Sequence, residues 1–233
     1  LWIPADQRFE PESVLAQICE QLGDQHLFVG DAKVEPVSGF RGGMNEGVWI
    51  LSTGVKQAGL DTRHGYVLKL VRAQRRHPSV PSDLENFIRL GQDFPHIAHD
   101  PMVAFPIKIF GCSEESGQRR FDLLAMKRAH GVRLCEVIGQ LWYGGRKSQL
   151  FGLLRRLGLA LRRFHNRYLN AQHADFQPSN IFYDEGKEGN MPDGNPFTFI
   201  DLGGMGTRGV RECDVDHFKR ALRLIALTYG DQF

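Results

Sequence analysis

Two short segments in the second half of the chain combine acidic or amide side chains with apolar runs. In the first, Asp175 and Asn180 lie five positions apart, directly before the apolar residues 181–183. In the second, an apolar run ends at Asp201. Mg²⁺ prefers oxygen ligands and keeps several waters, so one or two such side chains suffice to hold it beside phosphate. A further carboxylate can accept the proton of an attacking hydroxyl group, so the pattern predicts a Mg²⁺–phosphate site with a base.

The order and spelling of these segments resemble a known superfamily. The letters H-A-D-F-Q-P-S-N of residues 173–180 and I-D-L-G of residues 200–203 resemble the catalytic loop and metal-binding turn of the protein-kinase-like superfamily. The aminoglycoside phosphotransferase and choline kinase branch, with its H-G-D-x-x-x-x-N loop, is the most similar. Ala174 departs from the usual Gly or Arg, and Leu202 from the usual Phe or Trp, but neither removes a ligating atom. The alternative is that Asp175 only caps a turn and Asn180 only begins a strand. If only one of the two motifs were present, this alternative would remain open.

The resemblance implies an enzyme that transfers the γ-phosphoryl group of ATP to a hydroxyl group, with ATP and Mg²⁺ as cofactors. Asp175 would be the catalytic base, and Asn180 and Asp201 would hold the Mg²⁺ ion. The nucleotide would be bound by residues from the first half of the chain, namely Gly39, Gly42, Gly43, Asn45, Gly47, Lys69, Glu85 and Lys127. Lys127 opens a segment that would meet adenine, which backbone groups would recognise.

A glycine-rich run between two strand-like segments is the candidate phosphate loop. The letters S-G-F-R-G-G-M-N-E-G span residues 38–47. Glycine allows positive φ, and it lets backbone N–H groups approach phosphate oxygens. Taken alone, the run is better explained as an ordinary hairpin turn. The order of the motifs instead favours the nucleotide loop of the aminoglycoside phosphotransferase group, with its G-G-x-x-N pattern. No Gly-Lys-Ser/Thr follows, so it is not a Walker loop.

Lys69 lies in the middle of an apolar strand pattern over residues 66–72. The resemblance assigns it to the α- and β-phosphates of ATP. Glu85, in a helix predicted over residues 81–91, has two interpretations. It can pair with Lys69, as in the family, or form a capping box with Ser82. One side chain cannot make both contacts well, and we favour the ion pair because Glu85 is the only Glu in this helix.

The hydrophobic pattern changes near residue 127, from mostly strand-like to mostly helical. We expect strands within residues 34–51 (two), 66–72, 102–111 and 121–126, and helices over 11–23, 134–142, 146–168 and 211–229. This is an α+β chain. The resemblance implies a two-lobe protein-kinase-like fold, with a five-stranded antiparallel sheet in an N-lobe (1–127) that also holds the N-terminal helix. Residues 128–233 would form a mainly helical C-lobe that is truncated, because the family builds its acceptor site from later helices.

Two further features have open interpretations. The predicted helix over residues 146–168 carries arginines largely off its apolar stripe, at positions 155, 156, 162, 163 and 167. They could bind nucleic acid, but no interleaved aromatic residues support this, so we expect a solvated helix face and no nucleic-acid partner. Near the last helix, Asp214 or Asp216 either anchors the backbone of the catalytic loop, as the resemblance suggests, or complements the helix N-terminus.

Composition narrows the class of protein. A hydrophobic content of 42% and a mean hydropathy of −0.32 are typical of a soluble globular protein. No apolar run is long enough to span a membrane. The four cysteines are scattered and form no CxxC pair, which suits a reducing compartment, with the cytoplasm as the default. The chain begins without Met, so we expect an N-terminal piece, with any targeting peptide, to be missing.

A small-molecule hydroxyl acceptor is favoured over a protein acceptor. Asp214 follows Asp201 by 13 positions, and no A-P-E segment lies between them. A protein kinase needs an activation loop and that segment there. Two alternatives remain: a catalytically silent, kinase-shaped binding or structural protein, and an atypical protein kinase. A protein partner is possible in each case.

Overall fold

The computed structural model describes residues 2–3, 10–23, 32–37, 47–53, 65–72, 81–114, 121–187, 194–207 and 213–229. By its internal contacts the chain divides into two compact units. The first comprises residues 1–85 and 105–128, and the second comprises residues 86–104 and 129–233. Residues 86–104 thus belong to the second unit, although the sequence-based division had included them in the N-lobe.

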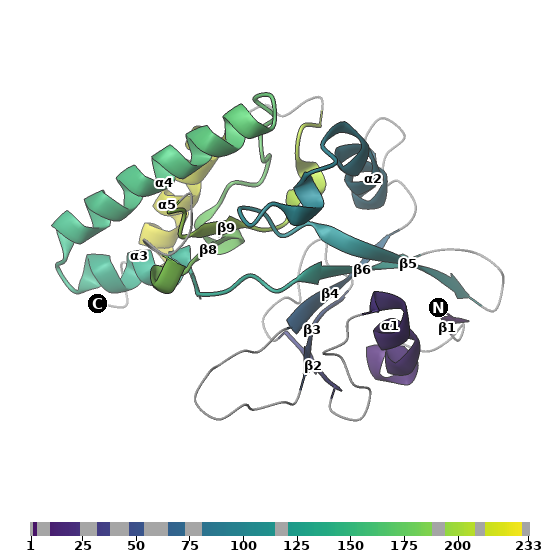
Figure 1. The fold of residues 1–233 in the computed structure, drawn as a ribbon. Helices are drawn as coiled ribbons and strands as arrows, with labels where there is room; N and C mark the ends of the chain where they lie inside the picture. The colour runs from purple at the N-terminus through teal and green to yellow at the C-terminus, as the bar shows by residue number, and fades with distance from the viewer. Residues whose placement is uncertain are drawn as a thin grey trace. The chain divides into compact units, whose positions relative to one another are not determined.

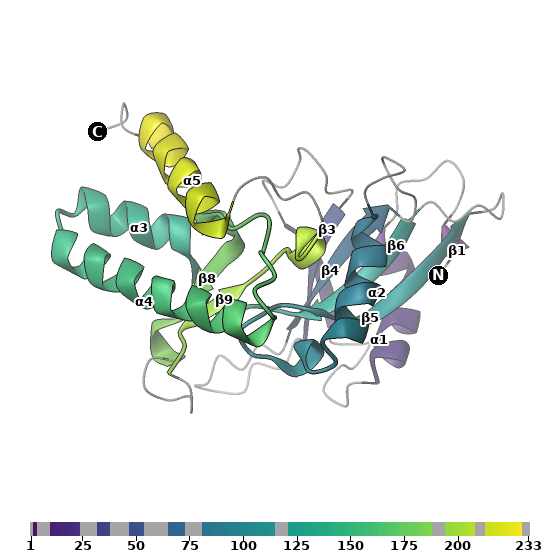
Figure 2. The same cartoon turned by 90° about the horizontal axis from the view of Figure 1, so that it is seen from above.

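An antiparallel sheet is the centre of the first unit (Figures 1 and 2). Its five antiparallel strands, in the spatial order β5-β6-β4-β3-β2, are β2 (Ala32–Pro36), β3 (Gly47–Thr53), β4 (Gly65–Arg72), β5 (Pro106–Glu114) and β6 (Phe121–Lys127). The predicted five-stranded antiparallel sheet is therefore confirmed. The strand β1 (Trp2–Ile3) extends the sheet by pairing in parallel with β5. It was not predicted, because two residues are too few to show alternation.

The core of the first unit lies between this sheet and one helix. A 3₁₀ turn, η1 (Pro11–Val14), leads into α1 (Leu15–Leu22), which ends at Gly23 with φ 62°. This C-cap conformation suits glycine, and the helix ends where the sequence predicted. Ile18 and Cys19 of α1 join a buried apolar cluster with strand residues such as Leu51 and Leu68. Burial in this cluster raises the pKa of the Cys19 thiol.

The helix α2 (Asp83–Asp93) begins with a reciprocal capping box. The backbone N–H of Ser82 donates to Glu85 Oε2 at 2.8 Å, and the N–H of Glu85 donates to Ser82 Oγ at 3.2 Å. These two bonds satisfy N–H groups that the first turn of a helix leaves without partners. The capping interpretation of Glu85 is therefore correct for Oε2, whereas its ion pair with Lys69 stays a prediction.

Three helices and a small sheet form most of the second unit. The helices are α3 (Leu134–Tyr143), α4 (Lys147–Arg167) and α5 (Asp214–Tyr229), and the antiparallel strands are β7 (Val132–Arg133), β8 (Ile181–Tyr183) and β9 (Phe197–Phe199). The strands β8 and β9 coincide with the two apolar runs beside the site motifs, whereas β7 is too short to be read from the sequence. Figures 1 and 2 show α3 running beside α4. None of the helices in the described part of the chain is long and apolar enough to cross a membrane.

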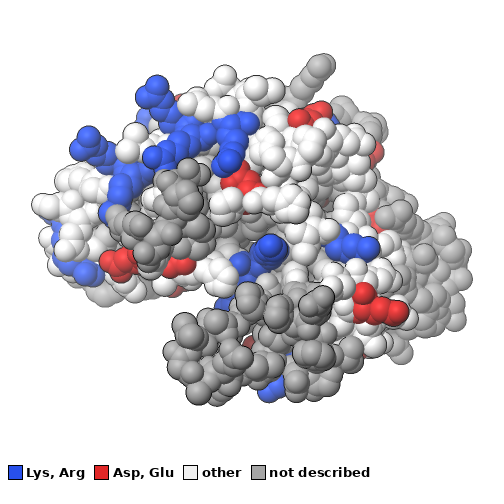
Figure 3. Space-filling view, in the orientation of Figure 1, with Lys and Arg blue, Asp and Glu red and all other residues white. Residues whose placement is uncertain are grey.

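The longest helix, α4, buries one stripe and exposes the opposite face. Its predicted apolar stripe is buried, as Leu150, Leu157 and Phe164 illustrate. Lys and Arg side chains gather on the outer surface over α4 (Figure 3). The helix is therefore amphipathic with a basic outer side.

Edge-on and tilted contacts between aromatic rings hold the segment after α4 in place. The ring of Phe199 in β9 meets Phe164 of α4 at a centroid distance of 5.4 Å and Phe176 at 5.3 Å, both edge-on. Phe176 also contacts Phe218 of α5 at 5.7 Å. Such pairs are a favourable arrangement of aromatic rings. They fix the loop that contains Asp175 between α4, β9 and α5.

Candidate active site

The hairpin of β8 and β9 brings two predicted metal ligands to the same end. Ile181 pairs with Phe199 in antiparallel register. One position further, the N–H of Ile200 donates to the carbonyl of Asn180 at 3.0 Å. Asp201 follows directly, before the 3₁₀ turn η5 (Leu202–Gly204). Because an antiparallel pair places the start of one strand beside the end of the other, Asn180 and Asp201 are neighbours, as the motif order predicted.

The side chains of Asp175 and Asn180 contact each other directly. Asn180 Nδ2 donates to Asp175 Oδ2 at 2.7 Å and to the Asp175 carbonyl at 3.1 Å. Gln177 Nε2 also donates to Asp175 Oδ2, at 3.2 Å. The Asn180 nitrogen therefore faces Asp175, which directs the amide oxygen to the opposite side of the planar group. That oxygen is the atom that could bind a metal ion.

A histidine that the sequence did not single out lies beside the proposed base. His217 Nε2, on α5, is 3.8 Å from Asp175 Oδ1. His217 Nδ1 is buried and has no hydrogen-bond partner among the described residues. The 3.8 Å separation is too long for a hydrogen bond, so the contact is electrostatic when the imidazole is protonated. His217 comes 42 positions after Asp175, and no motif connects the two residues.

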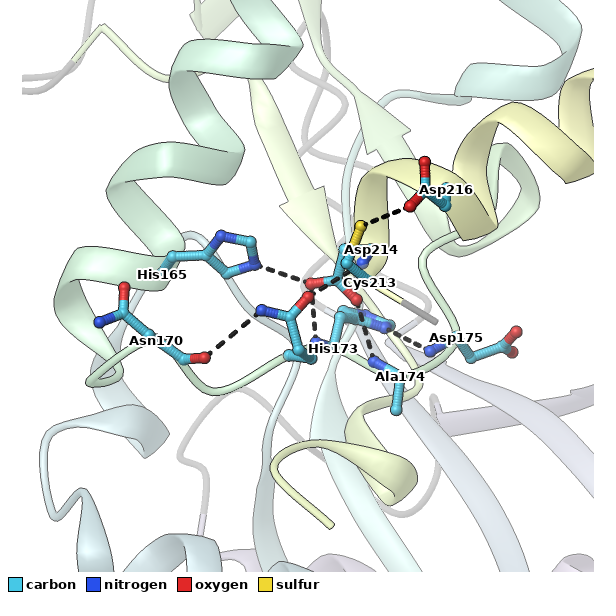
Figure 4. Close-up of polar contacts among 9 residues, drawn as sticks. His165, Asn170, His173, Ala174, Asp175, Cys213, Asp214 and Asp216 are labelled. Carbon is cyan, nitrogen blue, oxygen red and sulfur yellow. Dashed lines mark hydrogen bonds and ion pairs between the residues drawn. The ribbon is translucent and has the colours of Figure 1, made fainter. Parts of the chain in front are cut away.

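Asp214, the first residue of α5, anchors the loop that carries Asp175 (Figure 4). Its side chain is fully buried. Oδ2 accepts the N–H of His173 at 2.9 Å and lies 2.8 Å from His165 Nε2, while Oδ1 accepts the N–H of Ala174 at 3.1 Å. Of the two interpretations left open, anchoring of the loop backbone therefore holds for Asp214.

Asp216 has a different environment, although it is only two positions further along α5. It is exposed and contacts Cys213 Sγ at 3.1 Å and Lys219 Nζ at 3.2 Å. The hydrogen bond from Cys213, followed by that from Lys219, lowers the pKa of the Asp216 carboxyl. Asp216 therefore makes surface contacts and is not the anchor.

His173, the first residue of the loop motif, is fully buried. Burial lowers the pKa of its imidazole below the ordinary value, although Asp214, Asp201 and Asp175 act in the opposite direction. In the neutral form, Nε2–H donates to the carbonyl of Ile200 at 2.9 Å and Nδ1 accepts the N–H of Asp175 at 3.4 Å. His173 thus ties the loop to the end of β9, a structural role.

Two site residues that are not glycine have positive φ. Ala174 has φ 72° and Asp201 has φ 62°. This left-handed region is uncommon for residues with a side chain, and such residues cluster at functional sites. A Cβ added to Gly204 would lie 3.2 Å from the Ala174 Cβ. Gly204 therefore leaves room for the side chain of Ala174.

The donor set suits Mg²⁺ bound together with phosphate. Among the described residues, no group of three or more His, Cys, Asp or Glu side chains could hold a metal ion by itself. Mg²⁺ in nucleotide sites needs less, since one or two protein oxygens complete a shell of phosphate oxygens and waters. The carboxylate of Asp201 and the outward amide oxygen of Asn180 are hard donors of this kind. These two residues therefore fit a Mg²⁺ ion that is bound together with a nucleotide. They do not form a complete metal site by themselves.

The predicted nucleotide-binding residues belong to the first unit, whereas Asp175, Asn180 and Asp201 belong to the second. Lys69 is buried in the middle of β4, and Lys127 is exposed at the end of β6. Gly47 begins β3, and a Cβ there would overlap the indole ring of Trp49. Packing alone thus requires glycine at position 47. The other loop residues, Gly39, Gly42, Gly43 and Asn45, lie outside the described residues. The nucleotide-binding roles of all these residues stay predictions.

The second unit also contains a cavity of about 620 Å³, which is separate from the predicted site residues. Its lining includes Val132, Leu141, Arg146, Arg156 and Tyr183 but none of the predicted site residues. Arg156 stacks over the Tyr183 ring at 6.0 Å. This cavity is therefore not the predicted phosphate site.

Comparison with known proteins gives no family assignment. A scan against protein-family models finds no match, and a search of curated proteins finds none either. The functional argument therefore depends on the motif residues and on the geometry of the second unit.

Proposed function

We propose that this protein is an ATP-dependent phosphotransferase that transfers the γ-phosphoryl group to a hydroxyl group of a small molecule. One observation carries the proposal: Asp175 and Asn180 are hydrogen-bonded to each other, and Asn180 lies at the same end of the β8–β9 hairpin as Asp201. A two-lobe protein-kinase-like arrangement is part of the proposal. The five-stranded sheet of the first unit supports it, as does the helical character of the second.

Asp175 acts as the base in this proposal. Oδ2 is occupied by the amide donors of Asn180 and Gln177. Oδ1 has His217 at 3.8 Å, beyond hydrogen-bonding distance, and the side chain is 41% exposed. Oδ1 can therefore accept the proton of an acceptor hydroxyl while that oxygen forms its bond to phosphorus and the bond to ADP breaks.

The surrounding residues position this base and would hold the metal ion. Asn180 holds Asp175 through its nitrogen, and its oxygen would bind Mg²⁺ together with the Asp201 carboxylate. Mg·ATP supplies the phosphoryl group and the positive charge that offsets the phosphates. Asp214 keeps the loop backbone in place through the N–H groups of His173 and Ala174. Catalysis of this type depends mostly on such positioning.

The short connection after Asp201 supports a small acceptor. Only 13 positions separate Asp201 from Asp214, the anchor at the start of α5. That length leaves no room for the activation loop and A-P-E segment that protein kinases use at this point. The acceptor hydroxyl is therefore proposed to belong to a small molecule.

Calorimetric titration with ATP, with and without Mg²⁺, tests this proposal, followed by ADP-release assays with a panel of hydroxyl compounds. We expect Mg²⁺-dependent ATP binding, and ADP release that depends on one class of acceptor. Asp175→Asn is the control, and it should bind ATP without releasing ADP. Binding without turnover on any acceptor would support a catalytically silent, kinase-shaped protein. No ATP binding in either condition would refute the proposed phosphotransferase activity.

A further inference from the structure

All acidic or basic side chains of α4 other than His165 are Lys or Arg. Its 21 residues contain no Asp or Glu, and its charged residues are Lys147, Arg155, Arg156, Arg162, Arg163 and Arg167. Figure 3 shows Lys and Arg side chains gathered over this helix. A helix that only needs solubility usually mixes both signs of charge on its outer face. The uniform sign of α4 therefore indicates a negatively charged partner.

Large apolar side chains interrupt the basic surface. Phe151 is 66% exposed and Leu159 is 53% exposed. With Arg155 and Arg162, which are also exposed, they follow a spacing of three or four positions. These four residues therefore lie on one face of the helix, opposite its buried stripe. We call this set the α4 outer face.

An exposed tryptophan stands next to the beginning of the same helix. Trp142, near the end of α3, is 54% exposed. Lys147 Nζ, one turn before Phe151, lies 5.9 Å from the centre of the Trp142 ring. Tryptophan is enriched where a protein surface meets lipid headgroups, because its ring is apolar and its N–H is polar. An apolar and basic surface thus continues from Trp142 onto α4.

We infer that the α4 outer face, together with Trp142, binds an anionic membrane surface. Anionic headgroups attract clustered arginines, and the acyl boundary accepts Phe, Leu and Trp side chains. Nucleic acid would satisfy the arginines but offers little to an aliphatic side chain such as Leu159. A helix of this length, about 32 Å at 1.5 Å per residue, can lie flat in the interface. This inference is independent of the proposed phosphotransferase activity.

Co-sedimentation with vesicles tests the inference with the 233-residue chain. One set of vesicles contains phosphatidylcholine alone. The other contains phosphatidylcholine with about 30% phosphatidylserine and represents an anionic membrane leaflet. We expect binding only to the anionic vesicles, weakening as salt rises. The pairs F151S/L159S and R155E/R162E should each reduce binding at least about tenfold, because lipid attraction needs both apolar and basic groups.

The matched control reverses two charges elsewhere. Lys219 and Arg223 are exposed on α5, so K219E/R223E changes the net charge as much as R155E/R162E does. The control should keep most of the binding, and circular dichroism should show all variants folded. Equal losses in the two charge-reversal pairs would overturn the inference, as would no preference for anionic vesicles. Binding to an RNA oligonucleotide that F151S/L159S leaves intact would indicate nucleic acid instead. Self-association abolished by F151S/L159S would indicate a second copy of this chain.

Discussion

Replacing Asp214 by Asn changes one atom at the point that anchors the proposed catalytic loop. The buried carboxylate of Asp214 accepts the N–H groups of His173 and Ala174 and contacts His165. Asparagine keeps one oxygen, removes the charge and introduces an NH₂ group. The asparagine amide keeps more contacts when its oxygen takes the place of Oδ2. The NH₂ group then faces the N–H of Ala174.

The expected cost follows from this arrangement. A hydrogen bond to a charged group contributes about 1.5–3 kcal/mol, and a buried donor left without an acceptor adds a desolvation penalty. Asp214→Asn loses the bond to Ala174 and weakens the other two contacts of the carboxylate. We therefore expect a loss of about 2–4 kcal/mol in the free energy of unfolding. For a chain of this size, that corresponds to a decrease in Tm on the order of 10 °C.

Chemical denaturation and amide hydrogen exchange measure the effect, and Asp216→Asn is the matched control. It is the same substitution on the same helix, at an exposed carboxylate, and should reduce stability much less than Asp214→Asn does. The amide protons of His173 and Ala174 should exchange faster in Asp214→Asn and normally in Asp216→Asn. Equal stability of the two variants, or unchanged exchange at His173 and Ala174, would refute the anchoring role of Asp214.

Three further changes test other parts of the second unit. Tyr168→Phe removes the donor 2.7 Å from Asp100 Oδ2, where both groups are buried, and should cost about 1–3 kcal/mol in urea denaturation; an unchanged midpoint would show that another donor replaces it. Asp201→Gly should be more stable than Asp201→Ala by about 0.5–1 kcal/mol, because both variants lose the carboxylate and only glycine relieves the backbone held at φ 62°; equal stability of the two variants would contradict this. Gly204→Ala places a Cβ 3.2 Å from that of Ala174 and should cost about 1 kcal/mol. In an Ala174→Gly background the same Gly204→Ala change should cost little, and an equal cost in both backgrounds would argue against this contact.

Periodic and motif-bearing parts of the chain were predictable from sequence. The apolar stripe of α4 repeats at helical spacing from Leu150 to Phe164, and its members Leu157 and Phe164 are buried as expected. The resemblance assigned Asn180 and Asp201 to one ion, and the hairpin of β8 and β9 brings these two residues to the same end. Short strands such as β7 have no periodicity to detect.

Contacts between distant residues were not predictable in the same way. Asn86 is buried on α2 and donates to the carbonyl of Gly203 at 2.7 Å, across 117 positions. His217 reaches Asp175 from another helix. Neither side chain belongs to a local pattern, since only tertiary packing brings each one to its partner. The outer side of α4 was expected to be an ordinary solvated face, yet Phe151 is exposed among its arginines.

Calorimetric titration of Mg·ATP into the wild type, Asp201→Asn and Asp175→Asn tests the proposed division of roles most directly. Asp201→Asn removes a negative charge from the proposed metal ligand, so affinity should fall at least about tenfold, or about 1.4 kcal/mol. Asp175→Asn keeps an oxygen that can accept the Asn180 amide, so its affinity should stay within about twofold while phosphoryl transfer stops. Equal losses of affinity in both variants, or no Mg²⁺-dependent ATP binding by the wild type, would contradict the account.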